Sequence, residues 1–168
     1  LGTELAKLAL RQGLPVVICG GTGEAALVQA AEAIGAFDLT LLREQSGNEP
    51  TLVLSAQRAL ALGYSEQATG AVVLRAHGAF DVAALRTLVD PLDTARPPSA
   101  LLAAFEVART HPCDSAALKL AKLVGLLPAA LVARLDIAPN DLPGWAAERG
   151  VPLIAAEKIL LYEQHAGT

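Results

Sequence analysis

Residues 113–135 read CDSAALKLAKLVGLLPAALVARL and contain a helix, a turn and a buried strand in succession. Apolar residues recur at helical spacing over 116–124, and Asp114 or Ser115 is suited to cap the N-terminus of that helix. A Gly-Leu-Leu-Pro turn follows, and the segment 131–137, which begins Leu-Val-Ala, is predicted to be a strand. A helix that alternates with a buried strand is typical of a layered α/β domain.

The same alternation extends over the rest of the chain. Strands are predicted at 14–19, 51–55, 71–75 and 151–155. Helices are predicted at 1–12, from Asp38 or Thr40 to 45, and at 56–62, 82–89, 142–149 and 156–164. The segments 24–34 and 101–108 are each compatible with a helix or a strand. The best internal loop is 94–99, which is too short to separate domains, so we expect one domain over residues 1–168.

Composition excludes several classes of function. A net charge of -4 without a cluster of Lys and Arg argues against a nucleic-acid partner. The longest uncharged run, 14–23, is too short to span a bilayer, so no membrane partner is expected and the location is predicted to be cytoplasmic. The 2 cysteines form no disulfide framework, in agreement with a reducing compartment. The chain has no Met, and we take it as part of a longer polypeptide.

A glycine-rich turn is the first candidate site. Gly20, Gly21, Thr22 and Gly23 follow a predicted strand, and residues 21–26 fit the G-x-G-x-x-A form of a dinucleotide-binding turn. Such a turn would bind phosphate if a helix N-terminus followed it. The alternative is a plain tight turn, which Glu24 favours because its carboxylate would repel a phosphate.

Cys113 is the second candidate, as a nucleophile. Its neighbours are His111 and Asp114, and a nearby imidazolium or helix N-terminus lowers the pKa of a thiol. The alternative is a small buried cysteine beside a loop histidine. No metal site is expected from spacing alone, because His77 and His165 do not lie at ligand spacing from a pair of carboxylates.

Three stretches of the chain resemble the 3,4-dihydroxy-2-butanone 4-phosphate synthase family of the riboflavin pathway. Residues 10–18 (LRQGLPVVI) are similar to its opening "R-x-G-x-P-V-V" strand, and residues 84–91 (ALRTLVDP) to its "R-x-L-A-D-P" helix end. Residues 116–135 resemble the block "A-x-x-L-x-x-L-A-G-L-x-P-A-G-V", and 145–154 (WAAERGVPLI) the block "F-A-x-x-H-x-L-P-L-V". The resemblance implies a mixed β-sheet with helices on both faces and a homodimer.

The chain departs from this family where the family keeps its magnesium and acid–base residues. After the first strand, Glu24 is the only acidic residue left of a run rich in Asp and Glu. The metal-binding His of the family falls at Cys113, with Asp114 beside it, and a family Glu falls at Arg134. A fixed cation at about 4 Å would repel a divalent ion by several kcal/mol. The alternative for Arg134 is a surface charge at the end of a strand.

These departures imply a domain that keeps the scaffold without the chemistry. We expect a non-catalytic synthase-like domain with no cofactor and no metal, whose role is dimerisation or support of a GTP cyclohydrolase II domain that follows in the same polypeptide. A second hypothesis is a domain that holds a small phosphorylated ligand or nucleotide at the turn 20–23, with Arg109, Cys113 and Arg134 lining the remodelled pocket. A third is an active synthase with altered ligands.

Overall fold

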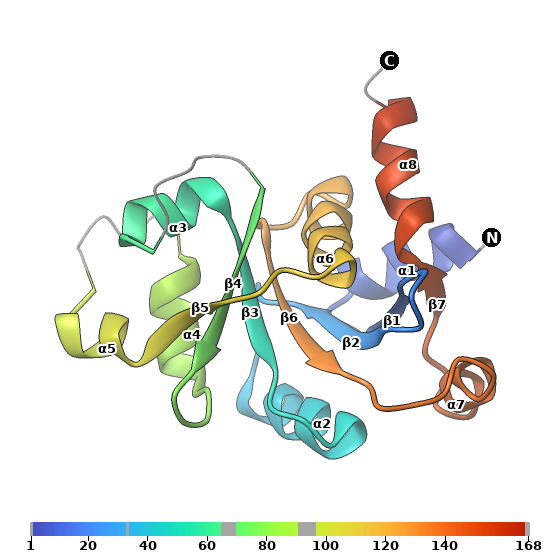
Figure 1. The fold of residues 1–168 in the computed structure, drawn as a ribbon, viewed down its shortest axis with the longest axis horizontal. Coiled ribbons are helices and arrows are strands. Elements are labelled where there is room, and N and C mark those ends of the chain that lie inside the picture. Colours follow the sequence, from blue (N-terminus) through green and yellow to red (C-terminus); the bar gives the residue numbers. More distant parts are fainter. Residues whose placement is uncertain (1, 33, 65–69, 91–96, 167–168) are drawn as a thin grey trace.

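The computed structural model describes residues 2–32, 34–64, 70–90 and 97–166 (Figure 1). Its centre is a 7-stranded mixed sheet with the order β5-β4-β3-β6-β2-β1-β7. Neighbouring strands are antiparallel except for β1 and β7, which are parallel. The strands are β1 (Val16–Cys19), β2 (Ala25–Ala30), β3 (Thr51–Ser55), β4 (Ala71–Ala76), β5 (Phe105–Ala108), β6 (Ala129–Arg134) and β7 (Leu153–Ala155).

Helices cover both faces of the sheet, which confirms the predicted architecture (Figure 1). They are α1 (Gly2–Arg11), α2 (Ala36–Ser46), α3 (Ala56–Leu62), α4 (Val82–Val89), α5 (Ser99–Ala103), α6 (Pro112–Leu123), α7 (Leu142–Glu148) and α8 (Ala156–Ala166). Helices α2, α3 and α4 pack on one face, and α1, α6 and α8 on the other. None of the described helices is long and apolar enough to cross a bilayer.

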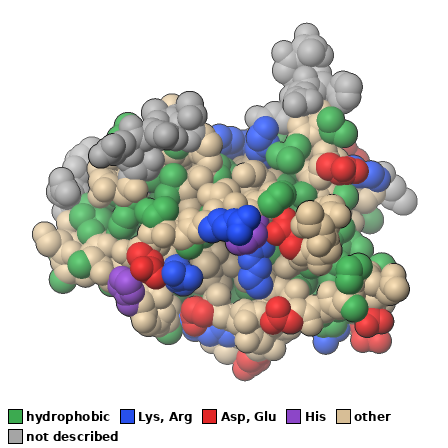
Figure 2. Space-filling model, viewed as in Figure 1, with side chains coloured by type: hydrophobic (Ala, Val, Ile, Leu, Met, Phe, Trp, Pro, Cys, Tyr) green, Lys and Arg blue, Asp and Glu red, His purple; other side chains and the backbone are tan. Residues whose placement is uncertain are grey.

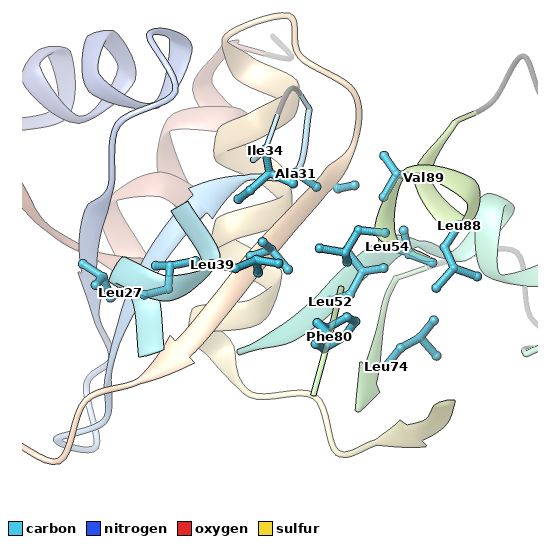
Figure 3. Close-up of a cluster of buried hydrophobic side chains, with 14 of the residues drawn as sticks. Leu27, Ala31, Ile34, Leu39, Leu52, Leu54, Leu74, Phe80, Leu88 and Val89 are labelled. Carbon is cyan, nitrogen blue, oxygen red and sulfur yellow. The ribbon is translucent and has the colours of Figure 1, made fainter. Parts of the chain in front are cut away.

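The central strands are apolar on both sides because each side faces its own layer of helices. In β3, Leu52 and Leu54 pack toward α2 and α4, whereas Val53 packs toward α6. In β6, Leu131 packs in the same core as Leu52 and Leu54, whereas Val132 packs in the same core as Val53. Figure 3 shows the first of these cores, in which leucines from β2, β3, β4, α2 and α4 converge. Successive strand residues point to opposite faces, so a strand covered twice needs apolar residues throughout.

Several predicted elements have different bounds in the structure. The ambiguous segment 24–34 is largely the strand β2, because it pairs with β1 on one side and β6 on the other. The segment 101–108 ends α5 and then forms β5, so both readings hold in part. The predicted strand 131–137 is shifted to β6. Of the predicted loop 94–99, residues 94–96 lie outside the described residues, Pro97 and Pro98 are irregular, and Ser99 begins α5.

The start of α6 was predicted wrongly. The helix begins at Pro112, four residues before the predicted start, and His111 is its N-cap residue. Proline is favoured at the first position of a helix, where its missing N–H costs no hydrogen bond. The carboxylate of Asp114 accepts a hydrogen bond from the backbone N–H of His111 (2.8 Å), so it stabilises the first turn from inside the helix.

Candidate functional site

The candidate site lies where three segments meet at one end of the sheet. Glu24 lies in the turn between β1 and β2, Asp114 in the first turn of α6, and Arg134 at the end of β6. The antiparallel pairing of β2 with β6 sets Ala26 opposite Arg134, which brings the β1–β2 turn beside the end of β6. Figure 2 shows basic, acidic and histidine side chains gathered at the centre of this face.

The guanidinium of Arg134 lies between two carboxylates. Its Nη2 donates a hydrogen bond to Asp114 Oδ2 (3.1 Å), and its Nη1 lies 3.7 Å from Glu24 Oε2. The side chain of Asp114 is fully buried, whereas those of Glu24 and Arg134 are 16% and 34% exposed. Arg134 ends β6 and is partly exposed, as the alternative interpretation expected, but its guanidinium also contacts two carboxylates that are largely or fully buried. The arginine links the β1–β2 turn, α6 and β6.

His111 lies against the same arginine and against Asp114. The ring Nδ1 lies 2.6 Å from Arg134 Nη2 and 3.5 Å from Asp114 Oδ2. The imidazole therefore belongs to the same cluster of polar side chains as Arg134 and Asp114.

Cys113 does not have the properties of a nucleophile, so that hypothesis is wrong. The residue is fully buried, and its Sγ donates a hydrogen bond to the carbonyl oxygen of Ile18 (3.5 Å). The pKa of the Cys113 thiol is raised to about 12, chiefly by burial and secondly by the nearby carboxylate of Glu24. The residue is a small core side chain, the alternative that its sequence context left open.

The two thiols are expected to differ sharply in reactivity. Cys19 packs on the opposite face of the sheet from Cys113 and is half-buried. In a Cys19→Ser variant, we expect a disulfide reagent to find no reactive thiol in native buffer and one equivalent after unfolding in denaturant. Rapid native labelling of Cys113 in this variant would contradict the burial of its thiol.

The glycine-rich turn is a tight reverse turn. The N–H of Gly20 donates to the carbonyl of Glu24 (2.8 Å), and the chain returns antiparallel as β2. No helix N-terminus follows residues 21–26, so the dinucleotide-binding interpretation of these residues is wrong. A Cβ at Gly20 would lie 2.5 Å from Glu24 Oε1, so a larger residue there would force the Glu24 side chain to move. The missing side chain lets Glu24 fold back toward Arg134.

A pocket of about 380 Å³ opens beside this cluster and is lined by Glu24, Arg134, Leu135, Asp136 and their neighbours. Glu24 Oε1, Asp114 Oδ1 and Arg134 Nη1 are buried without a hydrogen-bond partner within the described protein. The guanidinium of Arg134 contacts both of these carboxylates. No group of three or more His, Cys, Asp and Glu among the described residues is arranged for a metal.

Sequence reasoning missed the contacts made by His111 and Arg134. Residues that are distant in the chain meet here because of strand register, which no local pattern encodes. The Glu24–Arg134 contact could have been predicted only by assuming that residues 24–30 and 129–134 pair as antiparallel strands. Arg109, which was assigned to the remodelled pocket, is exposed.

Comparison with known proteins gives one curated sequence relative and several structures. The chain is 29% identical over 164 residues to a GTP cyclohydrolase-2 from Azospirillum brasilense. The match covers 96% of the chain and 42% of that protein, so the chain spans about two-fifths of its length. No protein-family model matches.

The similar structures all have the same fold. A cation-free 3,4-dihydroxy-2-butanone 4-phosphate synthase superposes with a TM-score of 0.73 at 16% identity, covering 97% of both chains. The Candida albicans enzyme has a TM-score of 0.70 at 20% identity, covering 95% of both. A two-domain synthase from A. baumannii has a TM-score of 0.72 at 19% identity, covering 95% of this chain and 57% of its own. This chain therefore has the fold of 3,4-dihydroxy-2-butanone 4-phosphate synthase.

Proposed function

We propose that this chain is a non-catalytic synthase-like domain of a riboflavin-biosynthesis protein of the GTP cyclohydrolase II type. The observation that carries the proposal is the position of Arg134 between Glu24 and Asp114. The resemblance assigns this part of the fold to a magnesium ion and its carboxylate ligands. In this chain, the positive charge at that place is the guanidinium of Arg134, which is part of the protein itself.

A divalent ion would have to displace or approach this guanidinium. A guanidinium is a permanent cation under ordinary solution conditions. Two like charges about 4 Å apart repel by roughly 4 kcal/mol at an effective dielectric near 20, and a divalent ion doubles that cost. Oxygen ligands at close range are what magnesium requires, and the arginine already engages the carboxylates that could supply them.

The cluster has a structural role instead. Arg134 connects the end of β6 with the N-terminus of α6 and the β1–β2 turn. Asp114 is buried and its carboxylate also accepts from the backbone of His111, so the network preserves the shape of this end of the sheet. We infer that the domain retains its fold in order to dimerise or to support a neighbouring domain.

The neighbouring domain would be a cyclohydrolase. The similarity to the A. brasilense protein covers nearly all of this chain and leaves more than half of that protein unmatched. We propose that the parent polypeptide carries GTP cyclohydrolase II activity outside residues 1–168 and that this domain itself needs no cofactor. The coding sequence beyond Thr168 tests this arrangement directly, because a GTP cyclohydrolase domain should follow.

Catalytic inactivity is tested with the substrate that the synthase family uses. We expect no formate above the enzyme-free rate when the protein is incubated with ribulose 5-phosphate and magnesium, because no divalent ion can bind between Glu24 and Asp114. An active synthase assayed in parallel is the control. Formate release at an enzymatic rate would overturn the proposal in favour of a synthase with altered ligands.

The alternative function is binding of a small phosphorylated ligand or nucleotide. The observation that favours it is Arg134 Nη1, which is buried beside the pocket without a hydrogen-bond partner in the described protein. The two carboxylates oppose it, since each would repel a phosphate. An increase of the melting temperature with inorganic phosphate or AMP that is lost in Arg134→Gln would favour this alternative over a purely structural role.

A further inference from the structure

Two polar side chains are buried in the part of the chain that the structure describes, and they lie toward opposite ends of the sheet. Asp114 belongs to the Arg134 cluster, whereas Gln29 is 5% exposed and lies near the other end of β2. Every residue of β2 is buried, and all except Gln29 are apolar. A buried amide is costly unless its polar atoms are hydrogen-bonded, so Gln29 needs a partner for its nitrogen and for its oxygen.

The neighbours of Gln29 fix the orientation of its amide group. Nε2 donates to the carbonyl oxygen of Gly13 (2.7 Å) and to Asp38 Oδ1 (3.1 Å). A carbonyl oxygen only accepts, so the atom that faces Gly13 must be the amide nitrogen, and both of its hydrogens are used. The amide oxygen Oε1 remains, and none of the described residues donates to it. Its partner is therefore a molecule from the solvent.

Gln29 lines a pocket of about 430 Å³ where the end of α1 meets the end of β2. The other side chains of this pocket divide into an apolar group (Leu10, Ile34 and Leu126) and a charged group (Arg11, Glu32 and Asp38). A pocket of this volume, with apolar walls and a few polar groups, is typical of sites for small organic molecules.

The inner wall of the pocket offers hydrogen-bond acceptors. Asp38 is half-buried; its Oδ1 accepts from Gln29 and its Oδ2 from the N–H of Gly35 (2.8 Å), and each oxygen can accept one more bond. The C-terminal end of α1 borders the same space and carries partial negative charge. A ligand therefore needs donors and a positive charge at its inner end.

The charges at the margin limit the ligand to one cationic group. Glu32 and Arg11 are both exposed, and Arg11 is the last residue of α1. Two carboxylates and one guanidinium leave a single net negative charge on the side chains that line the pocket. One cationic group neutralises that charge, and a second one would be repelled by Arg11.

We propose that this pocket binds a small organic cation with one ammonium or guanidinium group. The head group donates to Gln29 Oε1 and to the carboxylate of Asp38, since both kinds of cation carry several N–H donors and no acceptor. The carbon chain of the ligand packs against the apolar wall. The inference goes beyond the proposed function, because the pocket lies away from the Arg134 cluster and involves neither magnesium nor a cyclohydrolase domain.

Binding is tested by titrating the isotope-labelled chain with n-butylammonium and, separately, n-butylguanidinium at constant ionic strength. We expect saturable changes in the amide NMR signals of residues around the pocket, among them Gly13 and Ala30. The comparison of the two cations shows which head group is preferred. Butyrate and n-butanol have the same carbon chain without a positive charge, and neither should give saturable changes at the same concentrations.

Variants locate the bound cation. Asp38→Asn removes the inner charge and should weaken binding at least about tenfold. Gln29→Met keeps the length of the side chain but removes Oε1, and should also weaken binding. Glu32→Gln changes only an exposed margin and should weaken binding about 2- to 5-fold. Glu148→Gln is the matched control, because it neutralises a carboxylate on α7 that is 81% exposed and should leave the affinity unchanged.

Three results would overturn the proposal. They are the absence of saturable changes with either cation, an equal response to butyrate or butanol, and equal affinities in the Asp38→Asn and Glu148→Gln variants. The partner of Gln29 Oε1 would then be water alone. If Asp38→Asn does not fold, Glu32→Gln decides in its place, and an unchanged affinity in that variant counts against the proposal. None of these outcomes bears on the formate assay.

Discussion

Replacing Arg134 with alanine is expected to lower the free energy of unfolding by about 3 kcal/mol. The fully buried carboxylate of Asp114 would lose its cation, and Glu24 would remain nearby with the same sign of charge. Removing one partner of a buried ion pair costs about 3–5 kcal/mol, because the remaining charge is left uncompensated. We choose the lower end since Arg134 is 34% exposed. Urea denaturation followed by circular dichroism measures the change.

The control for this variant is Arg75→Ala. Arg75 pairs with Glu106 across β4 and β5, but both side chains are largely exposed (60% and 45%), so the unfolding midpoint should hardly move. A second variant separates loss of packing from loss of charge. If the two carboxylates repel, adding Glu24→Gln to Arg134→Ala should recover part of the lost stability. An equally small effect for Arg134 and Arg75 would contradict the central role of the arginine.

Leu131→Ala is the second change with a large expected effect, again about 3 kcal/mol of unfolding free energy. Leu131 is fully buried in β6, which pairs with β3 on one side and β2 on the other. Truncating a leucine in a packed core removes apolar contacts and leaves a cavity, at a cost of about 2–5 kcal/mol. Thermal and urea unfolding at matched protein concentrations would measure it.

Leu60→Ala is the matched control for this prediction. It makes the same chemical change on α3, where the side chain is 44% exposed, and should cost less than about 1 kcal/mol. Both variants should keep the far-ultraviolet spectrum of the native sheet and helices. A cost for Leu131 as small as that for Leu60 would mean that the centre of the sheet can close around the missing side chain.

At the candidate site, the local sequence pattern around Asp114 did not predict where α6 begins or which side chain Asp114 contacts. The sequence around Asp114 favours a helix that begins after an acidic cap, and a cap was predicted there. In the structure Asp114 lies inside the first turn, because its carboxylate accepts from His111 and from Arg134. The contact with Arg134 depends on where β6 ends, which residues 111–116 alone do not encode.

The segment 24–34 shows the same competition in a strand. Its alanines favour a helix on propensity, and its sequence is compatible with either a helix or a strand. It forms β2 because neighbours on both sides satisfy its backbone and bury its side chains. Intrinsic strand preference is weak compared with such pairing.

The amino-acid sequence alone was sufficient for the layered α/β fold and for most of the helices and strands. These features depend on periodicity and residue type, which are local properties of the chain. Tertiary structure alone decided that Arg134 lies between Glu24 and Asp114, that Cys113 is an inert core thiol, and that Leu5 and Leu8 of α1 stay exposed. Each of these depends on strand register or helix docking, which bring together residues distant in the chain and so determine which charges meet and which side chains are buried.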